Sequence, residues 1–91
     1  MGAIFDYRIY RDIEMEELRK KWNDDVEEDL YENGHSYSGS IGMLGSRFVL
    51  KSEKGSKELA IEYIEENHDK WDAPMCVPFP GGYVIGGWCS S

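Results

Sequence analysis

Small residues, hydroxyls and one imidazole gather in a short stretch near the middle of the chain. The stretch reads Gly34-His35-Ser36-Tyr37-Ser38-Gly39-Ser40-Ile41-Gly42, and Arg47 follows it closely. Glycine lets a ligand approach the backbone, hydroxyl and imidazole groups supply hydrogen bonds, and arginine supplies positive charge. Such a strip could hold a phosphate or a ribose. The competing interpretation is a tightly packed or bulged strand.

The C-terminal segment is the second stretch with unusual residue types. It runs from Gly81 to Ser91 and carries Tyr83 and Trp88 among four glycines. An exposed aromatic ring can stack on a nucleotide base, whereas a buried tryptophan docks on the protein's own core. The ligand-binding hypothesis therefore rests on eight residues: His35, Ser36, Tyr37, Ser38, Ser40, Arg47, Tyr83 and Trp88.

Acidic residues crowd the second half of the first expected helix. They are Asp24, Asp25, Glu27, Glu28, Asp29 and Glu32. The helix dipole disfavours negative charge at this end, so the run breaks a local rule without evident compensation. One interpretation is a binding face, formed by Asp24, Asp25, Glu27 and Glu28, that mimics nucleic-acid charge toward a basic protein. The other is a solvated helix face.

No constellation of residues predicts catalysis or a metal centre. His35, His68, Cys76 and Cys89 lack the spacing of a zinc site. The chain has no G-x-S-x-G turn, and its glycines do not fit a P-loop or a dinucleotide-binding turn. We therefore expect no enzyme, no cofactor and no metal.

Length and charge narrow the classes of partner. The chain has 91 residues, which predicts a single domain over residues 1–91, and its net charge is −8. Nucleic acid and anionic membranes would repel such a surface. No apolar run spans a bilayer and no signal peptide is evident, so we expect a cytoplasmic protein with Cys76 and Cys89 as free thiols.

Hydrophobic periodicity predicts the elements of the first half. Residues 4–10 alternate as a strand, with Phe5, Tyr7 and Ile9 on one face. A helix should follow, capped by Asp12 and ended by Asn33-Gly34. Its apolar stripe consists of Met15, Leu18, Trp22, Val26 and Leu30.

Local patterns in the second half predict further strands and a second helix. Residues 36–44 and 47–51 read as two strands of a hairpin, and Ser56 can cap a helix whose apolar stripe continues to Trp71. Residues 75–89 then read as strands that turn at Pro80-Gly81-Gly82. The resulting β-α-β-β-α-β(β) order predicts an α+β fold, a ferredoxin-like two-layer sandwich with both helices on one face of an antiparallel sheet.

Two segments carry a resemblance to known proteins. The run Tyr31-Glu32-Asn33-Gly34-His35-Ser36-Tyr37-Ser38-Gly39, with Gly86-Gly87-Trp88-Cys89-Ser90-Ser91, resembles small uncharacterised proteins of tailed phages and prophages. The resemblance implies a non-catalytic binding protein in the cytoplasm of a host cell. It carries over no functional residue.

Three functions agree with these observations. The first is sequestration of a phosphorylated, nucleotide-derived defence signal by the eight residues named above. The second is inhibition of a basic host protein by the acidic run. The third is a structural or assembly role through sheet-edge pairing, which would make the chain a homo-oligomer.

Overall fold

The C-terminal hairpin forms the centre of the sheet in the computed structural model, which describes residues 2–33, 40–69 and 71–90. Its arms are β3 (Met75–Phe79) and β4 (Gly82–Ser90), paired antiparallel with Val77 opposite Val84. Gly81, in the turn, has a φ of +98°, a left-handed conformation that glycine adopts without steric cost. The predicted turn at Pro80-Gly81-Gly82 is therefore confirmed.

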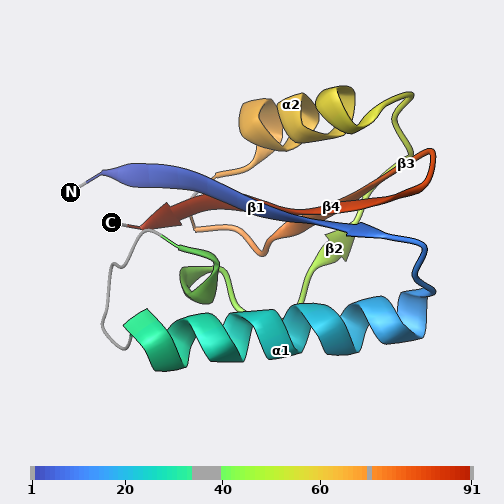
Figure 1. Cartoon of the computed structure of the whole chain (residues 1–91). Coiled ribbons are helices and arrows are strands. Elements are labelled where there is room, and N and C mark those ends of the chain that lie inside the picture. The colour runs from blue at the N-terminus through green and yellow to red at the C-terminus, as the bar shows by residue number, and fades with distance from the viewer. Residues whose placement is uncertain (1, 34–39, 70, 91) are drawn as a thin grey trace.

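Two further strands flank this hairpin in the order β1-β4-β3-β2. β1 (Ala3–Arg11) lies antiparallel to β4 along its whole length, with Tyr7 opposite Gly86. The short β2 (Val49–Leu50) lies parallel to β3 at the other edge. Figure 1 shows β1 in the foreground, crossing the full width of the molecule.

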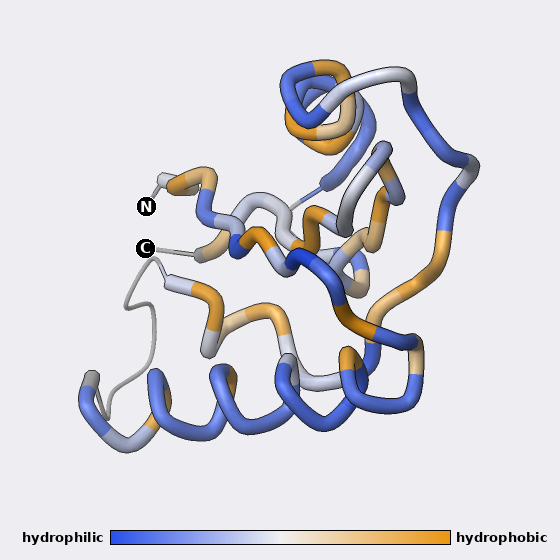
Figure 2. The backbone as a smooth tube through the Cα atoms, turned by 45° about the vertical axis from the view of Figure 1, so that its right-hand side comes forward, coloured by the Kyte–Doolittle hydropathy of each residue, from blue (hydrophilic) through white to orange (hydrophobic). Residues whose placement is uncertain are grey.

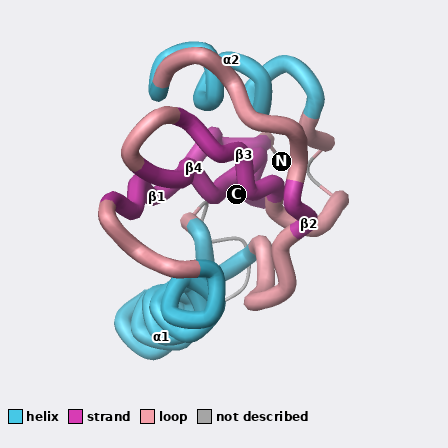
Figure 3. Tube along the Cα trace, turned by 90° about the vertical axis from the view of Figure 1, so that its right-hand side faces the viewer, coloured by secondary structure: helices cyan, strands magenta, loops and turns pink. Residues whose placement is uncertain are grey.

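The two long helices cover opposite faces of the sheet. α1 (Met15–Asn33) runs beneath the sheet and α2 (Lys57–Asn67) lies above it (Figures 1 and 3). A short 3₁₀ helix, η1 (Ile41–Met43), packs between α1 and β4. The molecule thus has three layers, and β4 and β3 are buried between two helices.

Each helix packs against its own core. On the α1 side the buried residues include Leu18, Trp22 and Val26 from the helix, which pack with Cys76, Ile85 and other sheet residues. On the α2 side Ala60 and Ile64 pack on Met75, Val77, Phe79 and Val84. Because neighbouring strand residues point to opposite faces, Val84 serves one core and Ile85 the other.

The predicted α+β class, with two helices on one sheet, is confirmed, but the finer layout differs from a ferredoxin-like one. The sheet is mixed, its strand order is not that of a ferredoxin, and the helices do not share a face. The reason is visible in β3 and β4, whose consecutive residues are apolar. A strand that is apolar on both faces needs cover on both faces.

The predicted hairpin of residues 36–44 and 47–51 does not form in the part that the structure describes. Residues 36–39 lie outside the described residues, residues 41–43 form η1, and only residues 49–50 form a strand. Asp6 and Asp29 cause this change, because their carboxylates accept the backbone N–H groups of Ile41 and Gly42, at 3.0 and 2.8 Å. Those groups are then unavailable to a strand partner.

The predicted helix caps have opposite outcomes. Ser56 caps α2, and its hydroxyl accepts the N–H of Leu59 at 3.2 Å. Asp12 does not cap α1. It has a φ of +52° and donates its N–H to the Gly81 carbonyl at 3.3 Å, which ties the end of β1 to the hairpin turn. α2 also ends at Asn67, so Trp71 lies outside the helix and is exposed.

Candidate functional site

The second half of α1 presents acidic side chains in two directions. The buried stripe faces the sheet and contains Leu18, Trp22 and Val26. Asp25 and Asp29 flank this stripe and are partly buried, while Asp24, Glu27, Glu28 and Glu32 are exposed. Figure 2 shows the hydrophilic colour over most of α1, in contrast to the strands above it.

Asp25 binds the sheet directly. Its Oδ2 accepts a hydrogen bond from the Tyr10 hydroxyl at 2.6 Å, and Lys21 lies 3.9 Å from its Oδ1. Burial, with the hydrogen bond to Asp25 and its charge, raises the pKa of Tyr10 well above the ordinary value for a phenol. Asp25 was predicted to belong to an exposed partner-binding face, but it is in part a structural anchor.

Asp29 and Asp6 hold η1 against α1 and β1. Asp29 Oδ2 accepts the Ser40 hydroxyl and the Gly42 N–H. Asp6 Oδ2 accepts the Ile41 N–H, while its Oδ1 accepts the N–H of Tyr7 and the Arg8 guanidinium, both at 3.0 Å. The segment that enters η1 is therefore positioned by two carboxylates from different elements.

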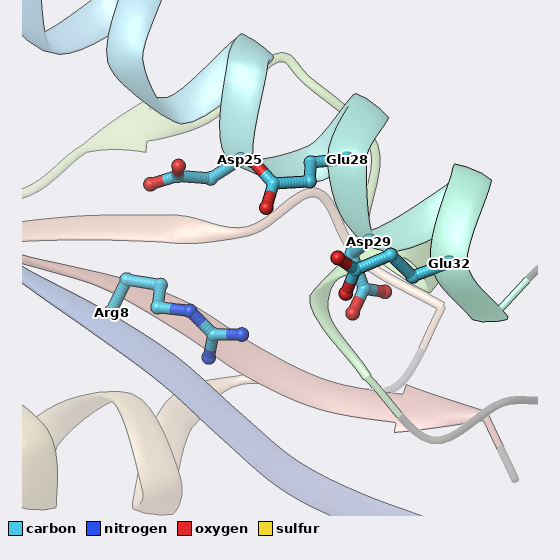
Figure 4. Close-up of a pocket in the computed structure, with 5 residues that line it drawn as sticks. All are labelled: Arg8, Asp25, Glu28, Asp29 and Glu32. Carbon is cyan, nitrogen blue, oxygen red and sulfur yellow. The ribbon is translucent and has the colours of Figure 1, made fainter.

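A polar hollow of about 150 Å³ lies between α1 and β1. We call it the acidic groove, and its lining residues are Arg8, Asp25, Glu28, Asp29 and Glu32. Figure 4 shows Arg8 projecting from β1 toward the four acids that descend from α1. The Arg8 side chain is 42% exposed and lies 3.0 Å from Asp6. The groove thus holds one resident cation among four acids.

The exposed side of the same helix segment carries acids that overlap with the groove, since Glu28 and Glu32 belong to both. We call it the acidic face, formed by Asp24, Glu27, Glu28 and Glu32 around Tyr31. Among the described residues, the ion pairs are Arg8–Asp6, Lys21–Asp25 and Lys57–Glu58, so none involves the acidic face. Tyr31 is 89% exposed. Three of the four acids predicted for partner binding, Asp24, Glu27 and Glu28, lie on this face.

The residues predicted to bind a small ligand do not come together in the described part of the structure. His35, Ser36, Tyr37 and Ser38 lie outside the described residues. Ser40 bonds to Asp29, and Arg47 is exposed just before β2. Tyr83 packs on the α1 side, whereas Trp88 packs with Phe5 near α2. Tyr83 and Trp88 lie on opposite faces of the sheet and cannot stack on one base.

Trp88 and His68 connect β4 to α2. The Trp88 indole N–H donates to the Glu65 carbonyl at 2.9 Å, and its backbone N–H donates to His68 Nδ1 at 2.9 Å. Since Nδ1 accepts, Nε2 carries the proton and faces the carbonyls of Asp72 and Ala73. His68 therefore replaces a neighbouring strand where β4 extends beyond the start of β3.

Other reactive groups in the described residues are inert or scattered. Burial raises the pKa of the Cys76 and Cys89 thiols to about 12, which keeps them protonated. Within residues 2–33, 40–69 and 71–90, no group of three or more His, Cys, Asp or Glu could hold a metal ion. No helix there is long and apolar enough to cross a bilayer.

Sequence reasoning missed Arg8 and Tyr31 as parts of a surface, and it placed Asp29 in the acidic run but not among the four partner-binding acids. The signal for Arg8 was its position in β1, where alternation places its side chain on the opposite face from the apolar residues of the strand. The signal for the groove was helical spacing, because residues four apart share one side of a helix and the pairs 25/29 and 28/32 are both acidic. The contact that joins Arg8 to these acids depends on where α1 crosses β1, which no local pattern specifies.

Comparison with protein-family models, with curated proteins and with solved structures finds no match to this chain. The geometry of α1 and β1 therefore carries the functional argument.

Proposed function

We propose that this protein binds a basic protein partner through the acidic face of α1. The observation that carries the proposal is the set of four exposed carboxylates, none of which forms an ion pair among the described residues. Charged side chains that serve only the fold gain from a local partner or from the helix dipole. None of these four forms an ion pair among the described residues, and they lie in the half of α1 where the dipole disfavours acids and the last turn carries no basic residue.

The density of charge on this face is close to that of a DNA strand. A helix rises 1.5 Å per residue, so residues 24–32 span about 12 Å and carry four outward acids, roughly one per 3–4 Å. One strand of duplex DNA carries a charge per about 3.4 Å of axis. A protein surface that binds nucleic-acid phosphates would find similar charge on this helix.

Tyr31 adds a contact that charge alone does not supply. It extends from the middle of the acidic face and is 89% exposed. Tyrosine is enriched at the energetic centre of protein interfaces, and an aromatic ring attracts arginine and lysine. The combination suits a partner rich in arginine and lysine. In the context that the phage resemblance implies, this would be a basic protein of the host.

A matched pair of charge variants tests the proposal. D24N/E27Q/E28Q/E32Q removes the acidic face, and E58Q/E62Q/E65Q/E66Q removes four exposed acids from α2. Both variants change the net charge from −8 by the same amount. We expect only the first variant to lose the proteins that the unmodified chain captures at low salt. Each exposed ion pair with a partner should contribute about 0.2–1 kcal/mol to the binding free energy. Four contacts then change Kd by about fourfold or more.

The decisive comparison is between the two variants. If both lose the same partners equally, binding follows net charge and the acidic face has no special role. If neither loses them, the acids of α1 are only a solvated surface and the proposal is wrong. A Tyr31→Ala variant sharpens the test, since it leaves the charge unchanged.

A further inference from the structure

Among the described residues, no strand pairs with the outer edge of the nine-residue β1. The sheet order places β1 at one end, with β4 on its inner side. Tyr7 shows which groups face outward, because its N–H and carbonyl are bonded by the neighbouring side chains of Asp6 and Arg8 rather than by β4. Since antiparallel pairing alternates, Phe5 and Ile9 also direct their N–H and carbonyl away from β4.

The acidic groove lies alongside this open edge. α1 runs along the direction of β1 in Figure 1, and Figure 4 shows its inner acids above the strand. Acids four residues apart, such as the exposed Glu28 and Glu32, are separated by about 6 Å along the helix. Side chains on one face of a strand repeat about every 6.6 Å. A strand added to β1 could therefore match consecutive acids with alternate residues.

Arg8 already occupies part of the space that an added strand would use. Its Nη1 donates to the Tyr7 carbonyl at 2.9 Å and to Asp6 at 3.0 Å, while the side chain lines the groove. The Tyr7 carbonyl is the acceptor that a partner backbone would need. Arg8 thus contacts both features that an added strand would use: the outward carbonyl of Tyr7 and the acidic lining of the groove.

We propose that an extended basic segment of the partner adds to the β1 edge, with alternate lysine or arginine side chains in the acidic groove. This inference rests on the proposed function and specifies how the partner binds. Strand addition gains backbone hydrogen bonds from the edge and selectivity from alternate side chains. Arg8 competes with the incoming segment for the Tyr7 carbonyl and for the acids.

A second copy of this chain fits the edge less well. Two β1 strands paired antiparallel would be related by a two-fold axis normal to the sheet, which places both α1 helices on the same face. Their groove acids would then face each other with only two Arg8 side chains between them. Like charges at close range disfavour this arrangement, whereas a basic segment neutralises the acids.

Synthetic peptides separate strand addition from simple charge attraction. The probe is a fluorescent nine-residue peptide in which lysine alternates with valine or threonine, and its binding to the full chain is measured by anisotropy. A control has the same composition with its lysines consecutive. Two further peptides carry backbone N-methyl groups, either on the lysines or on the residues between them. All four have the same charge.

We expect the alternating peptide to bind at least fivefold more tightly than the consecutive one, and only one N-methylated peptide to lose binding. With lysines facing α1, an antiparallel strand directs the intervening amides toward β1, and a parallel strand directs the lysine amides toward it. The N-methylated peptide that loses binding therefore also shows whether the added strand is antiparallel or parallel to β1.

A pair of arginine variants tests the role of Arg8. R8A frees the Tyr7 carbonyl and removes the resident cation, so we expect it to tighten binding of the alternating peptide about fivefold, as for one exposed hydrogen-bond competitor. R47A removes the same charge beside β2, at the opposite edge, and should change Kd less than twofold. Equal effects of the two variants would contradict competition by Arg8.

The outcomes distinguish this inference from the proposed function. Equal binding of all four peptides, weakened by D24N/E27Q, whose two residues do not line the groove, overturns strand addition and leaves the acidic face as a binding surface. Absence of binding by any peptide overturns strand addition, while the capture experiment still decides the proposed function. Self-association of the full chain, measured by sedimentation and inhibited by the alternating peptide, would identify a second copy as the occupant instead.

Discussion

The two faces of the sheet are stabilised by different kinds of interaction. On the α2 side the core is formed by aliphatic and aromatic side chains such as Ile64, Val77 and Phe79. On the α1 side a comparable core is bordered by polar anchors: Tyr10 binds Asp25, Trp22 donates to the Gly45 carbonyl at 3.1 Å, and Asp29 holds η1. The α1 side therefore combines packing with specific polar contacts, and it is the side that carries the candidate site.

The two faces of the sheet also differ in how strongly their stability should depend on pH. The buried core residues on the α2 side carry no titratable group, although His68 joins α2 to β4 at the border of that core. The α1 side contains Tyr10, Cys76 and Cys89, the three groups whose pKa values are raised by burial. The candidate site thus lies over the core that depends most on the protonation of its residues.

The largest expected effect comes from truncating the α1 core. Trp22 is fully buried, and its indole N–H bonds the Gly45 carbonyl. Trp22→Ala removes that packing and should lower the free energy of unfolding by about 3–5 kcal/mol. Ile64→Ala, the comparison on the α2 side, should cost about 2–5 kcal/mol. Denaturant unfolding measures both, and a loss under 1 kcal/mol for Trp22→Ala would show that α1 is not part of the cooperative core.

Alkaline pH should weaken the α1 side next. The thiols of Cys76 and Cys89 have pKa values of about 12 in the folded chain against an ordinary value near 9. A raised folded pKa means that the unfolded chain releases protons first, so stability is full below pH 9 and falls as pH rises toward 12. Each thiol contributes about 1.4 kcal/mol per pH unit in that window.

Unfolding at a series of pH values between 7 and 11 measures this effect. The raised pKa of Tyr10 acts in the same direction above its own ordinary range. A C76A/C89A variant should show a flatter decline above pH 9, since Tyr10 alone remains. An unchanged slope in that variant would show that the thiols are not the cause.

The sequence predicted the elements on the α2 side better than those on the α1 side. The Ser56 cap, the buried Ala60 and Ile64 of α2 and the C-terminal hairpin follow from local patterns, although Leu59, predicted for the same stripe, is exposed. The entry to η1 did not, because the carboxylates that accept the Ile41 and Gly42 N–H groups are 35 and 13 residues away in sequence. Nothing local distinguishes a glycine-rich strand from a segment held by distant carboxylates.

The arrangement of the layers was not predicted for the same reason, because it depends on contacts between residues that are far apart in the sequence. The apolar pairs Cys76-Val77 and Val84-Ile85 indicate strands that are buried on both faces, and this was the signal for helices on opposite sides. A helix stripe shows only that a helix packs on something. The candidate groove follows from that placement, so it could not be predicted before the path of α1 was known.

Gly87→Ala should produce an intermediate effect at the link between β4 and α2. A Cβ at Gly87 would lie 2.5 Å from the His68 ring, and His68 Nδ1 accepts the Trp88 N–H. Displacing the ring strains this contact, so we expect a loss of about 1–3 kcal/mol. Gly55→Ala is the control, because its Cβ would meet Leu59 at an ordinary 3.8 Å. Thermal unfolding of the two variants should differ clearly, and equal stabilities would remove His68 from the account of β4.

The smallest expected effect is a gain in stability at the acidic face. Asp24, Glu27, Glu28 and Glu32 lie in the half of α1 where the dipole disfavours negative charge. D24N/E27Q/E28Q/E32Q should therefore raise the free energy of unfolding by about 0.3–1 kcal/mol at low salt, and added salt should reduce the gain. The α2 variant E58Q/E62Q/E65Q/E66Q gives the reference for net charge alone. If the α1 variant is less stable than that reference, the four acids support the fold, and their conflict with the dipole is no longer a reason to assign them to a partner.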